Sequence, residues 1–335
     1  LREEYESIFE DGSGKMTVSR GKVHTYLGMT LDFSAPGEVS ITMLDYIKEY
    51  LAAFDKAAPK ERGIKTSAAP SDLYTVRQDS AKLVKAKSEQ FHSIVAKVLF
   101  ATKRSRPDAG TSISYLTTRV REPNQDDWSK MVHLMKYIRG TWDLPLILRA
   151  DGSGMLKWCI DASHGVHKDM RGHTGGGLTM GTGFPITAST KQKLNTRSST
   201  ETEIVGVDDV MPMVLWSRLY LEGQDYGVTE NIVFQDNQTA ILLEKNGKRS
   251  SGKRTKHINV RYFFITDRVA KGDVSLKWCP TGDMTGYFWT KPNQGALFIQ
   301  FRDLIMGVRP QPDPGPGKHK EPKGKKLGKQ AGKHG

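Results

Sequence analysis

The sequence predicts an α/β protein in which a mixed β-sheet is flanked by helices and preceded by a smaller, mainly helical region. Three observations support this fold class. Beyond residue 150, apolar runs of strand length alternate with segments of helical spacing. Before it, most segments have apolar residues at helical spacing. The Gly-rich connector at 151–154 separates the two patterns, so we expect units at residues 1–150 and 151–308 and a basic tail at 309–335.

The first unit is expected to begin with strands and to continue with helices. The expected strands are 22–33 and 38–42, and the expected helices are 43–54, 89–104, 107–121 and 126–139, with a loop at 56–86. The last of these helices has the clearest signals. Asp126 or Asp127 can cap it, Trp128 begins its apolar face, and Gly140 ends it.

The second unit is expected to build the mixed sheet. The expected strands are 156–161, 175–181, 184–190, 231–236 and 273–279, and the expected helices are 200–221, 238–245, 258–270 and 293–305. A hairpin turn is expected at 181–183. The glycines at 175–177 do not indicate a dinucleotide site, because no helix begins after them. The chain from Pro310 on is rich in Pro, Gly and Lys, and we expect it to be disordered.

Length and composition restrict the class of protein. A chain of 335 residues is long enough for about two domains. No apolar run approaches the roughly 18 residues of a membrane helix, and the first residues have no signal-peptide pattern, so no membrane partner is expected. The start at Leu1 suggests a fragment of a longer protein. Cys159 and Cys279 lack metal-ligand spacing and are expected to be core thiols in a reducing compartment.

The formal net charge of +13 favours a polyanionic partner. Part of this charge is local, because residues 311–335 hold seven lysines against Asp313 and Glu321, a net of +5. The remaining +8 belongs to the rest of the chain. Many proteins with a positive balance bind no nucleic acid, so the charge alone leaves both interpretations open.

Three acidic residues occur where a sheet and a helix would bring them together. Asp161 ends the first strand of the second unit, in WCIDASHG, and Asp236 ends the strand NIVFQD. If these two strands are adjacent and parallel, both side chains lie at the sheet edge where ligand sites of open α/β sheets occur. Glu203, near the start of the helix at 200–221, would reach the same edge if that helix packs on the sheet.

Carboxylates so close together repel one another and need cations to hold them in place. Oxygen ligands of this kind suit Mg²⁺, and two such ions about 3.5–4 Å apart can activate a water and stabilise the leaving oxygen of a phosphodiester. The structural alternative is that the three residues only end strands or favour a helix N-terminus. His164, His167 and His173 lack suitable partners for a zinc site, so we expect polar loop histidines.

Five motifs of the second unit occur in the order and spacing of a known family. They are WCIDASHG (158–165), SSTETEIVG (198–206), FQDNQTAILLEKN (234–246), KRTKHINVRYFFI (253–265) and CPTGDMTGYFWTKP (279–292). Together they closely resemble the RNase H domain of copia-type LTR-retrotransposon polyproteins. The segments 26–32, 91–116 and 128–146 are similar to the end of that family's reverse transcriptase, beyond its palm. The resemblance covers about residues 15 to 308.

The resemblance implies an RNase H-like five-stranded sheet after a reverse-transcriptase thumb or connection region. It also implies hydrolysis of the RNA strand of RNA–DNA hybrids by a two-metal mechanism with Mg²⁺ or Mn²⁺. Asp161, Glu203 and Asp236 match the family's first three acidic ligands, and Glu201 is expected to stabilise the first helical turn instead. The basic residues expected to contact phosphates are Lys248, Arg249, Lys253, Arg254, Lys256, His257 and Arg261, although a merely solvated charged face is the alternative for each.

The implied partners are the hybrid and an upstream polymerase part of the same polyprotein, in a cytoplasmic particle or the nucleus. The family's polymerase motif, Tyr-x-Asp-Asp, does not appear in this sequence, so no polymerase active site is expected here. The lysine-rich tail would add affinity for nucleic acid that falls as salt rises.

The chain departs from the family at the fourth acidic ligand. Family members usually carry Ala-Asp before the F-x-T-K-P stretch, where this chain has Gly286 and Tyr287. A neutral tyrosine is a poor ligand for Mg²⁺. Asp283 lies four residues earlier and would share a helical face with position 287, so it is the candidate replacement. The sequence therefore leaves two functions open, an active ribonuclease H and a degenerate remnant that binds hybrid or duplex without cutting it.

Overall fold

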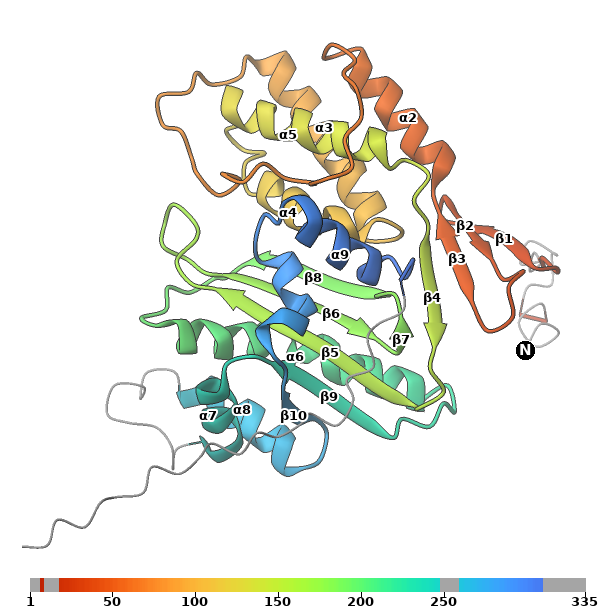
Figure 1. Ribbon diagram of the computed structural model, residues 1–335, viewed down its shortest axis with the longest axis vertical. Helices are drawn as coiled ribbons and strands as arrows, with labels where there is room; N and C mark the ends of the chain where they lie inside the picture. Colours follow the sequence, from red (N-terminus) through yellow and green to blue (C-terminus); the bar gives the residue numbers. More distant parts are fainter. Residues whose placement is uncertain (1–6, 9–17, 248–258, 310–335) are drawn as a thin grey trace, which may run out of the picture.

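The computed structural model describes residues 7–8, 18–247 and 259–309, with a layer of helices above a large sheet and a smaller sheet beside it (Figure 1). The strands are β1 (Val23–Tyr26), β2 (Met29–Asp32), β3 (Val39–Thr42), β4 (Leu146–Ala150), β5 (Met155–Ser163), β6 (His173–Thr179), β7 (Gly181–Thr182), β8 (Ile186–Lys191), β9 (Glu230–Gln235) and β10 (Ser275–Trp278). The helices are α2 (Leu44–Asp55), α3 (Lys85–Thr102), α4 (Gly110–Thr117), α5 (Gln125–Gly140), α6 (Ser199–Glu222), α7 (Gln238–Asn246), α8 (Asn259–Ala270) and α9 (Gly295–Ile305), with 3₁₀ segments η1 (Pro107–Ala109), η4 (Thr281–Asp283) and η5 (Thr285–Trp289). None of the described helices is both long and apolar enough to cross a membrane.

The larger sheet has the strand order β10-β9-β5-β6-β8. β10 runs parallel to β9, and β9 runs parallel to β5. β6 is antiparallel to both β5 and β8. The sheet is therefore mixed and five-stranded, as the sequence predicted. With helices on both of its faces, this is an RNase H-like fold.

The three glycines of β6 show what covers each face of this sheet, because successive residues of a strand point to opposite faces. A Cβ on Gly176 would make ordinary contacts with Ile160 and with Val210 of α6. A Cβ on Gly177 would lie 2.6 Å from the Trp289 ring, and one on Gly175 would lie 2.7 Å from Thr290. Helix α6 thus covers one face and η5 covers the other, at a distance that only glycine permits.

The smaller sheet has the order β1-β2-β3-β4-β7 and is antiparallel throughout. The prediction of one strand at 22–33 was wrong, because Leu27 and Gly28 both have positive φ and turn the chain into the β1–β2 hairpin. The predicted hairpin turn at 181–183 was also wrong. Gly181 and Thr182 form β7, which pairs with β4 and joins the two parts of the molecule.

Helix α5 begins at Gln125, so its N-cap lies before both of the predicted caps. Asn124 is the N-cap, and its side chain accepts a hydrogen bond from the Asp127 backbone N–H at 2.9 Å. The Asp127 carboxylate accepts in return from the Asn124 N–H at 3.0 Å, which completes a capping box. Asp126 and Asp127 are therefore first-turn residues, and the prediction that one of them is the N-cap was wrong.

The hydrophobic core of the helical layer includes side chains from the far end of the chain. It is built mainly by α2, α3, α4 and α5, and it also contains Phe184, Phe288, Trp289, Phe298, Phe301, Leu304 and Ile305. Helix α9 thus packs within the helical layer (Figure 1). A second core lies between α6, α7, α8 and the larger sheet. The expected boundary at 150 falls between β4 and β5 and stays a prediction; the expected tail lies outside the described residues, apart from Arg309.

Candidate metal centre

Two neighbouring parallel strands deliver the two aspartates. Cys159 of β5 pairs with Phe234 of β9, so Asp161 and Asp236 lie side by side two residues further along. Asp236 directly follows β9, whereas β5 continues for two residues beyond Asp161, so the prediction that Asp161 ends its strand was wrong. Both aspartates still lie at the same end of the parallel pair, as expected. The Trp278 indole N–H donates to the backbone carbonyl of Asp236 at 3.2 Å, and the Thr281 hydroxyl donates to its carboxylate at 2.9 Å. β10 and η4 therefore fix the second aspartate.

Helix α6 delivers the glutamate. Ser198 is its N-cap and accepts from the Glu201 N–H at 3.2 Å, while the Glu201 carboxylate accepts from the Arg197 N–H at 2.7 Å. Glu201 therefore stabilises the first turn, which confirms that prediction. Glu203 lies in the next turn, where α6 packs against β5.

One ligand oxygen from each of Asp161, Glu203 and Asp236 lies within 4.8 Å of the others. Asp161 is 5% exposed and Glu203 is 6% exposed, whereas Asp236 is half-buried. Among the described residues, the buried Oε2 atom of Glu203 has no hydrogen-bond partner. Three hard oxygen donors with an unpartnered buried atom fit a divalent cation such as Mg²⁺. We call these three residues the acidic group.

The electrostatics of the acidic group oppose ionisation without a cation. Burial raises the pKa of Glu203 well above its ordinary value, and the charges of Asp161, Asp236 and Glu244 raise it further. Burial also raises the pKa of Asp161, although a hydrogen bond from Thr290 and the charge of Lys291 oppose this. A bound cation would remove the penalty, because it replaces the protons that these carboxyl groups otherwise retain.

Glu244 is a residue that the sequence analysis missed. Its side chain is fully buried in α7, and burial raises its pKa well above the ordinary value, which the neighbouring Gln235 amide only partly offsets. It shares a buried helix face with Ala240, four residues earlier. Its position on the apolar face of the predicted helix could have indicated burial. Charged residues near helix ends are common, however, so this position alone did not identify it.

Tyr287 stands where the family resemblance places the fourth ligand, and it forms an aromatic–cation pair with Lys291. The Tyr287 ring lies 6.3 Å from the Phe301 ring, and the Lys291 ammonium lies 4.2 Å from the centre of the Tyr287 ring. Asp283 lies in η4 and does not belong to the acidic group. Its role as a replacement ligand stays a prediction.

The remaining predicted site residues have different outcomes. Lys248, Arg249, Lys253, Arg254, Lys256 and His257 lie outside the described residues, and Arg261 lies in α8. The prediction of polar loop histidines was wrong for His173, whereas His167 lies in a loop as predicted but is buried. His173 lies in β6 and is fully buried, and His167 is 5% exposed and hydrogen-bonded to it at 3.0 Å. His164 instead bonds the Thr202 hydroxyl at 2.8 Å, beside Glu203.

These elements define an RNase H-like fold with an acidic group at the carboxyl ends of two parallel strands. The chain is also similar in sequence to several known proteins. The chain is 29% identical over 188 residues to the retrovirus-related Pol polyprotein from transposon TNT 1-94 of Nicotiana tabacum, covering 56% of this chain and 14% of that protein. It is 25% identical over 293 residues to the Pol polyprotein from transposon RE1 of Arabidopsis thaliana, covering 87% of this chain and 19% of that protein.

A putative transposon Ty5-1 protein of Saccharomyces cerevisiae is 26% identical over 184 residues, covering 51% of this chain and 54% of that protein. These relatives confirm the predicted resemblance to Pol polyproteins of copia-type retrotransposons. The chain spans less than a fifth of the TNT 1-94 and RE1 polyproteins. A foamy viral protease-reverse transcriptase, solved in complex with RNA/DNA hybrid, is 13% identical with a TM-score of 0.43, covering 78% of this chain and 29% of that one. No family model matches the chain.

Proposed function

We propose that this chain is part of a retrotransposon Pol polyprotein and that residues 151–308 act as a ribonuclease H, which hydrolyses the RNA strand of RNA–DNA hybrids. The observation that carries the proposal is the acidic group, in which three carboxylates meet within 4.8 Å on an RNase H-like sheet. The similarity to retrotransposon Pol polyproteins supports the same activity.

In this proposal Asp161, Glu203 and Asp236 hold two Mg²⁺ or Mn²⁺ ions. Such ions, when bound, would supply the activation of a water and the stabilisation of the leaving oxygen of the phosphodiester. The protein's own contribution is to orient the carboxylates: the Thr290 hydroxyl donates to Asp161, and the Thr281 hydroxyl donates to Asp236.

Basic side chains near the acidic group would contact the phosphates of the hybrid. Two segments, 164–172 and 191–197, are joined by the ion pair of Lys191 with Asp169 at 2.8 Å and by the Asn195 amide, which donates to the Asp169 carbonyl at 3.1 Å. Their cationic residues are Lys168, Arg171, Lys191, Lys193 and Arg197. These residues were not predicted from the sequence, because they are scattered over two loops instead of forming one run.

A second function is favoured by the fourth ligand position. Tyr287 offers no carboxylate, and Lys291 lies over its ring. A site with three acidic ligands would hold one of the two ions more weakly. The alternative is therefore a chain that binds hybrid or duplex without cutting it.

The test uses the full chain with an RNA–DNA hybrid labelled in its RNA strand, in Mg²⁺ or Mn²⁺. We expect cleavage, and we expect Asp161→Asn to reduce it by more than about a hundredfold. Asp225→Asn is the matched control, because Asp225 is exposed after α6 and its positive φ is also accepted by asparagine. Cleavage that appears only in Tyr287→Asp would establish the non-cutting alternative for the unmodified chain. Equal cleavage by the wild type and Asp161→Asn would refute the acidic group as the active site.

A further inference from the structure

The segment that ends η5 is held by three hydrogen bonds to three successive backbone carbonyls. The Thr111 hydroxyl donates to the carbonyl of Phe288 at 2.7 Å, and the Ser189 hydroxyl donates to that of Trp289 at 2.9 Å. The Tyr74 phenol donates to the carbonyl of Thr290 at 3.0 Å. Two of these donors, Thr111 and Tyr74, come from the first 150 residues of the chain, so the helical layer fixes the path of this segment.

The same segment presses directly on the strand that carries Asp161. A Cβ on Gly286 would lie 2.9 Å from the backbone nitrogen of Asp161 and 3.0 Å from the carbonyl oxygen of Cys159. At the end of the same segment, the Thr290 hydroxyl donates to Oδ2 of Asp161. The carboxylate of the acidic group is therefore tied to a residue whose backbone is held by the helical layer.

Tyr74 is well placed to keep this bond under working conditions. Burial raises the pKa of its phenol, so the hydroxyl retains its proton and stays a donor. Its ring packs against the His167 ring at 5.1 Å and the His173 ring at 5.4 Å. Because the Ser189 proton is used on the Trp289 carbonyl, His173 donates to the Ser189 oxygen, at 2.8 Å. The histidine pair thus supports both Tyr74 and Ser189.

We propose that Thr290 is a positioning residue for Asp161 and that Tyr74 couples the first 150 residues of the chain to the affinity of the acidic group for a divalent cation. A hydroxyl donor fixes the rotation of the carboxylate, so a cation meets an oxygen that is already in place. Partners of metal ligands typically change metal affinity by about 10–100-fold when they are removed. The proposal rests on the proposed function only in that Asp161 is a metal ligand.

The test measures Mn²⁺ binding to the full chain by calorimetry, alongside thermal unfolding. We expect Thr290→Val to weaken Mn²⁺ binding by about 10–100-fold, while Thr290→Ser, which keeps the hydroxyl, retains most of the affinity. Tyr74→Phe is expected to weaken binding by up to about tenfold, because the ring remains and only the donor is lost. Tyr50→Phe is the matched control: no residue in the described ranges forms a hydrogen bond with the buried Tyr50 hydroxyl, so its loss should leave Mn²⁺ affinity unchanged.

Each outcome decides the proposal. Wild-type affinity in Thr290→Val, or equal weakness in Thr290→Val and Thr290→Ser, would overturn it, because the hydroxyl would then have no separate role. Unchanged affinity in Tyr74→Phe would overturn the coupling to the helical layer. Mn²⁺ binding that follows the expected order in a chain that cuts no hybrid would support the positioning role while refuting the proposed hydrolysis. A wild type that binds no Mn²⁺ would overturn both.

Discussion

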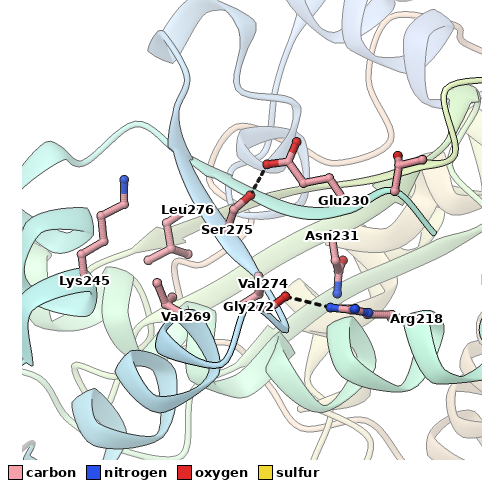
Figure 2. A pocket seen from close by; sticks show the side chains of 10 residues that line it. Arg218, Glu230, Asn231, Lys245, Val269, Gly272, Val274, Ser275 and Leu276 are labelled. Atoms are coloured by element: carbon pink, nitrogen blue, oxygen red, sulfur yellow. Dashed lines mark hydrogen bonds between the residues drawn. The ribbon is translucent and has the colours of Figure 1, made fainter.

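The two ends of the parallel strands β5, β9 and β10 differ in how their charged groups are satisfied. At the end where β9 and β10 begin, a cavity of about 280 Å³ is lined by residues that include Arg218, Glu230 and Ser275 (Figure 2). Arg218 donates to the Gly272 carbonyl at 2.9 Å, and Glu230 accepts from Ser275 at 2.7 Å and Lys277 at 2.8 Å. At the opposite end, a buried oxygen of Glu203 has no hydrogen-bond partner in the part of the chain that the structure describes.

The two ends differ in whether the protein itself stabilises the charge of its carboxyl group. Hydrogen bonds from Lys277 and Ser275 lower the pKa of Glu230, so its charge is stabilised by the fold itself. Burial raises the pKa of Glu203, so its charge is a cost to the folded state. The cavity is lined by groups whose charges the fold satisfies, whereas the acidic group is the better candidate for a functional site because burial and neighbouring charges shift its pKa values.

The largest expected contrast is between Glu203→Gln and Glu230→Gln. Because the pKa of Glu203 is raised in the folded state, the wild type loses stability as the pH rises above the ordinary value of 4.5. The amide cannot ionise, so at pH 7 without divalent cations Glu203→Gln should unfold at a higher temperature than the wild type. In Mn²⁺ the order should reverse, because only the wild type gains stability from binding.

Glu230→Gln should destabilise the fold by at most about 1 kcal/mol, since it removes a partly exposed ion pair. Its stabilisation by Mn²⁺ should match that of the wild type. Thermal unfolding with and without Mn²⁺ measures both effects. If Mn²⁺ stabilised Glu203→Gln as much as the wild type, Glu203 would not contribute to cation binding, and the proposed difference between the two ends would be wrong.

A second contrast concerns the close approach of η5 to β5. Gly286→Ala should destabilise the protein by about 1–3 kcal/mol, because the new Cβ meets backbone atoms of β5 that cannot move aside. It should also weaken Mn²⁺ binding, because η5 leads directly to Thr290. Gly282→Ala is the control, since a Cβ there meets nothing within 4 Å. Equal unfolding free energies for the two variants in denaturant titrations would contradict this packing.

The last contrast is the pH dependence of the histidine pair. Burial lowers the pKa of His173 to about 3 and that of His167 to about 4. The unfolded chain therefore binds more protons below the ordinary value of 6.5, and this contribution to stability falls as the pH falls from 6.5 toward about 4. At pH 5.5 the loss relative to neutral pH should be about 1 kcal/mol for each histidine, and therefore about 2–3 kcal/mol for the pair. His173→Gln should flatten this slope relative to the wild type, and an unchanged slope would show that the pair does not titrate as described.

The sequence predicted those parts of the site that depend on local pattern. Apolar runs that end at Asp161 and Asp236 identified two strands, and α6 was visible from its spacing. The Leu27–Gly28 turn was missed because a leucine rarely adopts positive φ, so the alternating pattern appeared unbroken.

Other parts of the site depend on contacts between distant segments. The Thr290 bond to Asp161 spans 129 residues, and the Tyr74 bond to Thr290 spans 216. Glu244 acts on Glu203 only because α7 packs beside α6. No pattern within a single element of the sequence contains this information.

The position of α9 has a consequence for how this chain is made. Phe298, Phe301 and Ile305 complete the core of the helical layer, whose other members come mainly from residues 43–138. Domains generally fold from the N-terminus as they emerge from the ribosome. Here the apolar side chains of α2 to α5 stay partly uncovered until residue 305 has been synthesised, so this core cannot be completed while the helical layer alone has left the ribosome.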